Sequence, residues 1–105
     1  MDQDLMNLKQ RTIKASIVFI RAQGAYLKAI APNAGKSRAE VKEAAEECLK
    51  AAEPYDSALQ DLREYLLAAE PSETIAVVLD HTERFIKALN KERKVCLKQI
   101  ARYKE

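Results

Sequence analysis

The sequence contains little of the material that turns, disulfide frameworks and metal sites require. Its 105 residues include two glycines, three prolines, two cysteines, one histidine and no tryptophan. So few turn-forming residues indicate a small number of long elements. Cys48, Cys96 and the single histidine are too few ligands for a disulfide framework or a cysteine zinc site. We therefore predict two buried thiols, no metal and no cofactor.

Long hydrophobic runs are also missing. No segment approaches the roughly eighteen apolar residues of a membrane span, and residues 1–4 lack the basic start and apolar core of a secretory signal. We therefore expect a cytoplasmic protein without membrane contact. With 48% hydrophobic and 32% charged residues, the composition is typical of a single globular domain over residues 1–105.

Apolar residues recur at alternating steps of three and four, the spacing of one side of a helix. The first predicted helix covers about residues 4–31 and ends at the turn-forming segment 32–35. Ser37 and Glu40 match a capping box that begins a second helix, which reaches about residue 69. Pro71 fits the first position of a third helix that runs to about Tyr103. The predicted apolar stripe of the second helix is Val41, Ala45, Cys48, Ala52, Tyr55, Leu59, Leu62, Leu66 and Ala69; that of the third is Ile75, Leu79, Thr82, Ile86, Leu89, Arg93, Cys96, Ile100 and Tyr103.

Three long helices with short connections must fold back on one another, which predicts an all-α, antiparallel three-helix bundle. Pro54 falls inside the second helix. We favour a kink there, because the apolar stripe keeps its phase through Pro54 and Glu53 is a poor N-cap. The alternative is a break at Pro54 that gives a four-helix bundle. Across the first connection we expect Gly24 and Ala25 to face Ala44 and Ala45, so that the two backbones approach closely.

The first helix is apolar around most of its circumference. One stripe follows Met6, Ile13, Ile17, Ile20, Leu27 and Ala31, and a second follows Ala15, Phe19, Ala22, Tyr26 and Ala29 on a different side. A helix in a three-helix bundle needs only one core-facing stripe. Either a split second helix covers the excess surface, or it binds a second copy or another protein. The predicted partner-binding residues are Ile13, Ile17, Phe19, Ile20, Tyr26 and Leu27.

Charge is divided along the chain. Residues 1–35 carry a net charge of +3, residues 36–83 carry −7, and residues 84–105 carry +6. A basic stripe about 22 Å long is predicted on the third helix, at Lys87, Lys91, Lys94, Lys98 and Arg102. Such a stripe fits nonspecific binding of nucleic acid. The simpler interpretation is that these cations complement the helix C-terminus and the acidic second helix.

The remaining motifs indicate little catalytic chemistry. Gly35, Lys36 and Ser37 resemble the end of a phosphate-binding loop, but Ile30 stands where that motif begins with glycine, and the preceding segment is helical. Lys36 and Ser37 therefore predict at most an anion site at a helix N-terminus. His81 lacks the Glu-x-x-His pattern of di-iron bundles, since Val78 stands three positions before it. We predict no catalytic residue and do not expect an enzyme.

These patterns favour a non-enzymatic helical interaction or assembly module that self-associates or docks a partner through the first helix. The alternative is a small nucleic-acid-associated protein that uses the basic stripe. A third hypothesis, a ligand-binding or catalytic bundle, requires a cavity between the helices.

Overall fold

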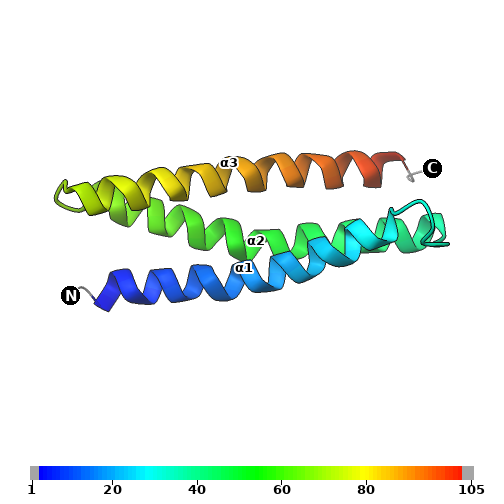
Figure 1. Cartoon of the computed structure of the whole chain (residues 1–105), viewed down its shortest axis with the longest axis horizontal. Helices are drawn as coiled ribbons and strands as arrows, with labels where there is room; N and C mark the ends of the chain where they lie inside the picture. The colour runs from blue at the N-terminus through cyan, green and yellow to red at the C-terminus, as the bar shows by residue number, and fades with distance from the viewer. Residues whose placement is uncertain (1–2, 103–105) are drawn as a thin grey trace.

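The computed structural model describes residues 3–102 and forms three antiparallel helices: α1 (Gln3–Ala29), α2 (Arg38–Ala68) and α3 (Glu73–Arg102). They make a rod of 51 × 20 × 19 Å, with α2 lying between α1 and α3 (Figure 1). No strand occurs among the described residues. The predicted all-α, antiparallel three-helix fold is therefore confirmed.

The α2 helix is continuous from Arg38 to Ala68 and carries Pro54 inside it. The alternative prediction, a break at Pro54 that yields four helices, is wrong. Pro54 is exposed, so its ring lies outside the core. The missing Pro54 N–H costs α2 one hydrogen bond to the carbonyl of Lys50, which the packing of the flanking turns tolerates.

Capping residues fix where the helices begin. The Ser37 hydroxyl accepts a hydrogen bond from the Glu40 N–H, and the Glu40 carboxylate accepts one from the Ser37 N–H, both at 3.2 Å, so the predicted capping box is confirmed. Ser72 accepts from the Ile75 N–H at 3.1 Å and precedes α3. The prediction that Pro71 starts the third helix is therefore wrong by two residues, because Ser72 provides a side-chain cap that proline lacks.

The core is organised around α2. Eight of the nine residues predicted for its apolar stripe are buried, as is Ala58, which the pattern missed. On α3, Thr82, Leu89 and Cys96 of the predicted stripe are buried, and Tyr103 lies outside the described residues. The central helix is more completely buried than the others because it has a neighbour on two sides.

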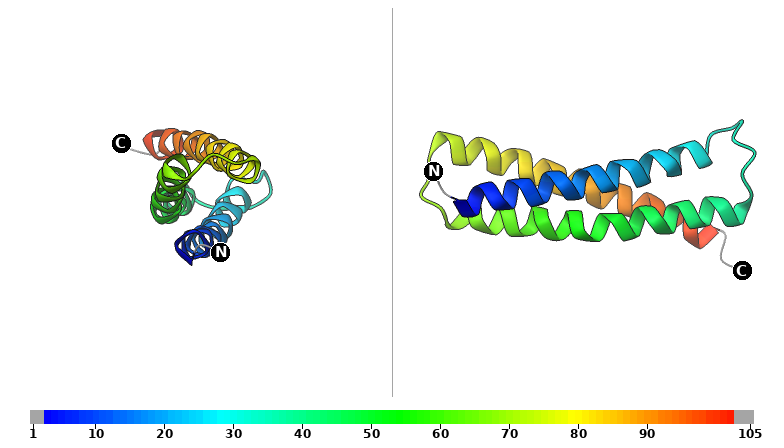
Figure 2. Two further views of the ribbon diagram at one scale, coloured as in Figure 1. Left: turned by 90° about the vertical axis from the view of Figure 1, so that its left-hand side faces the viewer. Right: turned by 90° about the horizontal axis from the view of Figure 1, so that it is seen from below.

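The outer helices touch α2 but do not approach each other. Close Cα approaches, within 8 Å, occur between α1 and α2 and between α2 and α3, and none occurs between α1 and α3 over residues 3–102. Viewed end-on, the helices do not form a closed ring (Figure 2). Each outer helix therefore lies closer to α2 than to the other outer helix.

Ion pairs link each outer helix to the acidic central one. Arg11 of α1 donates to Asp61 at 2.6 Å and to Ser57 at 3.0 Å. Between α2 and α3, Arg63 pairs with Glu83 at 3.3 Å, and the half-buried Arg93 pairs with Asp56 at 3.4 Å. Part of the charge division along the sequence is therefore used to hold the helices together.

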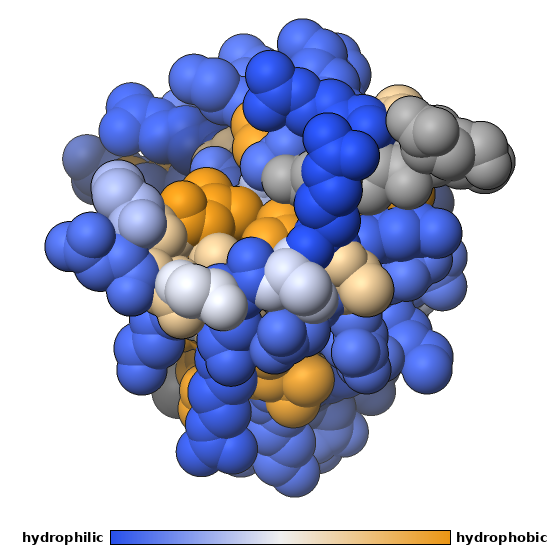
Figure 3. Space-filling view, turned by 90° about the vertical axis from the view of Figure 1, so that its right-hand side faces the viewer, coloured by the Kyte–Doolittle hydropathy of each residue, from blue (hydrophilic) through white to orange (hydrophobic). Residues whose placement is uncertain are grey.

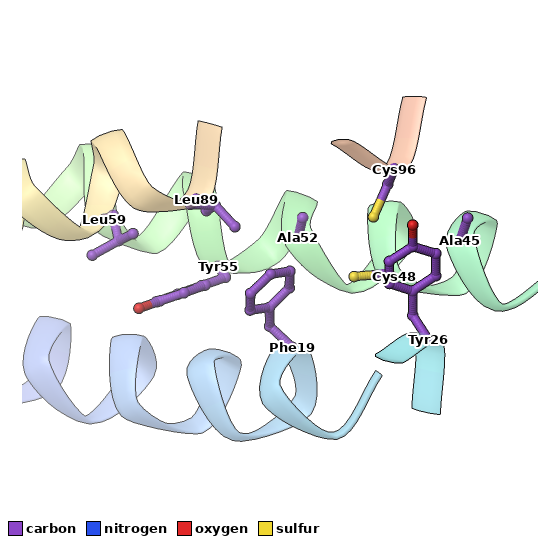
Figure 4. Packing of buried hydrophobic residues seen from close by; sticks show 9 residues of the cluster. All are labelled: Phe19, Tyr26, Ala45, Cys48, Ala52, Tyr55, Leu59, Leu89 and Cys96. Atoms are coloured by element: carbon purple, nitrogen blue, oxygen red, sulfur yellow. The ribbon is translucent and has the colours of Figure 1, made fainter. Parts of the chain in front are cut away.

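Figure 4 shows how side chains from all three helices meet in the middle of the rod. The rings of Phe19 and Tyr55 lie 5.6 Å apart, and Tyr26 extends from α1 towards Cys48 and Cys96. Both cysteines are buried free thiols that interact with each other. Burial raises the pKa of Cys48 and raises that of Cys96 to about 12, with smaller effects from the neighbouring thiol and Glu92.

Small residues lie together at the first connection, although not as the sequence predicts. Ala25 and Ala44 line one shallow depression between α1 and α2, as expected. The prediction that Gly24 permits close backbone approach is wrong, because a Cβ added there would meet nothing within 4 Å. Gly35 has φ +65°, a conformation that glycine adopts without strain in the turn after α1.

Candidate functional site

One of the two apolar stripes of α1 is buried and the other is exposed. Phe19, Tyr26 and Ala29 of one stripe are buried against α2. The other stripe remains exposed: Met6, Ile13, Ile17, Ile20 and Leu27. Over the described residues, the α1 backbone comes within 8 Å of α2 alone, so α2 covers one side of α1, and that side carries the rings of Phe19 and Tyr26.

The six residues predicted to bind a partner therefore divide into two groups. Ile13, Ile17, Ile20 and Leu27 expose 58%, 45%, 60% and 52% of their surface. Phe19 and Tyr26 are buried in the core, so they do not belong to the exposed surface. The sequence could not separate the groups, because both stripes have helical spacing and similar hydrophobicity.

Two pockets line a groove between α1 and α3. We call the first the Ile13 pocket; it has a volume of about 390 Å³ and is lined by residues of all three helices: Lys9, Thr12, Ile13, Leu59, Leu62, Val78, His81, Thr82 and Phe85. The second, the Ile30 pocket, has a volume of about 700 Å³ and is lined by Tyr26, Ile30, Val95, Lys98, Gln99, Ala101 and Arg102. Together they define the α1–α3 groove.

The groove is apolar at its floor and polar at its edges. Figure 3 looks at the end of the rod where α1 finishes and shows apolar surface in a hollow surrounded by hydrophilic residues. Exposed apolar side chains approach the groove from both sides: Ile13 of α1 and Ile30, which directly follows α1, and Phe85 and Val95 of α3. Phe85, Val95 and Ile30 were not among the predicted partner-binding residues. They are apolar residues that lie beside the predicted stripes, and this position off the core-facing side was the available signal.

The charges that line the groove are basic. The cations are Lys9 at the Ile13 pocket and Lys98 and Arg102 at the Ile30 pocket. No acidic side chain lines either pocket among residues 3–102. Between the pockets, Glu92 lies on the same side of α3 as Phe85 and Gln99, seven residues from each, and its charge contributes to raising the pKa of both cysteines.

The predicted basic stripe meets the groove at its C-terminal end, where Lys98 and Arg102 line the Ile30 pocket. Lys87, Lys91, Lys94, Lys98 and Arg102 are all exposed on α3. Arg102 donates to Gln99 at 3.3 Å. The ion pairs between α2 and α3 use Arg63 and Arg93, so over the described residues the acidic helix is not paired with the stripe lysines.

The predicted anion site is already occupied by the protein's own carboxylate. Glu40 accepts from the Ser37 N–H and lies 3.5 Å from the Lys36 ammonium. These contacts, first the backbone hydrogen bond from Ser37 and then the charge of Lys36, lower the pKa of Glu40. An external anion would have to displace Glu40, so we do not include Lys36 and Ser37 in the proposed function.

The described residues offer neither a metal cluster nor a membrane span. Residues 3–102 contain no cluster of three or more His, Cys, Asp or Glu side chains that could hold a metal ion. None of the helices in that range is both long and apolar enough to cross a bilayer. His81 lines the Ile13 pocket beside Lys9 and Thr82, without a neighbouring carboxylate in the pocket wall.

Comparison with known proteins identifies no relative of this sequence. The sequence matches no protein-family model, and no curated protein or solved structure is significantly similar to it.

Proposed function

We propose that this protein is a non-enzymatic helical interaction module that docks a second copy or another protein on the exposed side of α1. The proposal rests on one observation: an apolar stripe of α1 stays exposed although the opposite stripe packs against α2. The exposed residues are Ile13, Ile17, Ile20 and Leu27. Monomeric proteins rarely expose contiguous apolar patches of this kind unless the patch binds something.

The geometry supports docking of a helix. Since α1 and α3 both lie close to α2 while no Cα atoms of α1 and α3 lie within 8 Å of each other, a fourth helix placed in the α1–α3 groove would contact both. It would remove from water the exposed surfaces of Ile13, Phe85 and Val95. Burial of apolar surface gains roughly 25 cal/mol per Å² before the costs of association.

Site-specific photocrosslinking tests the proposal. A photoreactive amino acid is placed at Ile20 on the exposed apolar side, and in a matched protein at Val18, which is 55% exposed on another side of the same helix. We expect protein crosslinks, to a second copy or to another chain, from position 20 and few from position 18. Equal crosslinking from both positions, or none from position 20, would contradict the proposal.

The basic stripe favours a second candidate function, nonspecific binding of nucleic acid. Five exposed cations at steps of four and three along α3 could contact successive phosphates. A mobility-shift titration with duplex DNA and RNA tests it. Affinity should fall steeply as salt rises, and Lys91→Glu with Lys94→Glu should weaken it further. Absence of any shift in low salt at high protein concentration would rule it out.

A further inference from the structure

The two pockets of the α1–α3 groove are spaced for one continuous helix. Ile13 of α1 and Ile30, directly after the end of α1, are 17 residues apart, and His81 and Lys98 are 17 residues apart on α3. At 1.5 Å per residue, both separations correspond to about 25 Å. On a docked helix, residues 18 apart lie five turns apart on the same side, separated by about 27 Å. Two apolar residues at that spacing would reach both pockets at once.

The charges that line the groove determine which net charge a docked helix should carry. Lys9 lines one pocket, Lys98 and Arg102 line the other, and Glu92 is the one acidic residue in α1 or α3 between the two pockets. A helix with acidic residues at both ends and one cation near its middle would match this order. Opposite charges across an interface speed association and select the partner, and like charges oppose it.

A second copy of this chain matches the groove poorly. Its exposed apolar helix is α1, which contains five basic residues and a single acidic one, Asp4, between Gln3 and Ala29. Placing that helix in the groove would bring its lysines beside Lys9 and Lys98. Nucleic acid shares the required negative charge, but its phosphates gain nothing from the exposed Ile13, Phe85 and Val95 side chains.

We propose that the α1–α3 groove binds an acidic amphipathic helix of a different protein, about 20 residues or longer, with apolar anchors 18 residues apart. This rests on the proposed docking function and adds the chemical class of the partner. The groove would then hold the fourth helix of an antiparallel bundle, and the chain alone would be a monomer.

Two synthetic helices test the sign of the charge. The first is a 22-residue peptide with leucines along one side, glutamates beside them at both ends and one lysine at the centre. The second keeps the leucines and inverts every charge. Fluorescence anisotropy with the full chain should show at least tenfold tighter binding of the acidic peptide in about 50 mM salt. The difference should shrink in about 500 mM salt because screening weakens exposed charge pairs.

Matched substitutions locate the binding surface. Ile13→Asp in the groove should weaken binding of the acidic peptide at least tenfold, whereas Val18→Asp, at an equally exposed position elsewhere on α1, should change it less than twofold. Lys9→Glu should weaken binding at least threefold, and Lys14→Glu, outside both pockets, should not. Circular dichroism of each pair verifies that both variants fold equally.

The outcomes separate this inference from the function on which it rests. Equal binding of both peptides, weakened by Ile13→Asp, would overturn the acidic partner and leave the docking function standing. A second outcome would also overturn the acidic partner and leave the docking function standing: neither peptide binds, and sedimentation velocity shows a dimer that Ile13→Asp dissociates. The acidic partner and the docking function are both overturned if neither peptide binds and the chain is monomeric. They are also both overturned if Ile13→Asp leaves peptide binding unchanged. If a single-stranded oligonucleotide displaces the acidic peptide, and its own binding requires Ile13, the ligand of the groove would be nucleic acid and not a helix.

Discussion

The buried cysteine pair makes the stability of this protein depend on pH in a defined range. Burial raises the pKa of Cys96 from its ordinary value of 9.0 to about 12, and raises that of Cys48 as well. The folded state therefore keeps a proton that the unfolded state releases above pH 9. The stabilising contribution is fully present below pH 9 and is lost progressively as the pH rises from 9 towards 12.

The size of the loss follows from the two pKa values of Cys96. At pH 10 the unfolded thiol is about 90% ionised and the folded thiol is still protonated. The free energy of unfolding should therefore fall by about 1.4 kcal/mol between pH 8 and pH 10 through Cys96 alone. Cys48 adds to the loss, because its pKa shifts in the same direction.

Urea unfolding followed by circular dichroism, with a reductant present, measures this loss at pH 8, 9 and 10. The control is Cys96→Ala, which removes the titrating thiol. That variant should be less stable at every pH because it leaves a cavity, yet its stability should fall less between pH 8 and 10, by about 1.4 kcal/mol. Parallel pH profiles for the two proteins would refute the argument, because the ionisation of Cys96 would then not be coupled to folding.

Two further substitutions test the helices and the turn. Pro54→Ala restores a hydrogen bond within the continuous α2 at an exposed position, so it should raise the free energy of unfolding by about 1–3 kcal/mol in urea titrations; a decrease would show that the shape of α2 at Pro54 is needed for packing. The two glycines should respond with opposite signs. Gly24→Ala places a methyl group in open space within α1 and should stabilise by about 0.5–1 kcal/mol, whereas Gly35→Ala, at φ +65°, should destabilise by about 1 kcal/mol. Thermal unfolding followed by circular dichroism checks both, and shifts of the same sign would contradict the assigned backbone roles.

The sequence by itself determined the class of fold and most of its central helix. The shortage of glycine and proline allowed few turns, and steps of three and four placed the apolar stripe of α2 through Pro54 without a break. The capping box at Ser37 was visible because it depends on residues only three apart. Local interactions of this kind can be predicted from local sequence.

Only the tertiary structure decided which side of α1 is core. Phe19 and Ile20 are neighbours with similar hydrophobicity, yet Phe19 is buried and Ile20 is exposed. The difference arises because, over the described residues, the α1 backbone lies close to that of α2 and not to that of α3, and helix packing is a property of the whole chain. The groove has the same origin: Ile13 and Phe85 line one pocket although 72 positions separate them in the sequence. Periodicity shows that a helix has apolar sides, but only the positions of the other helices determine which side remains free to bind.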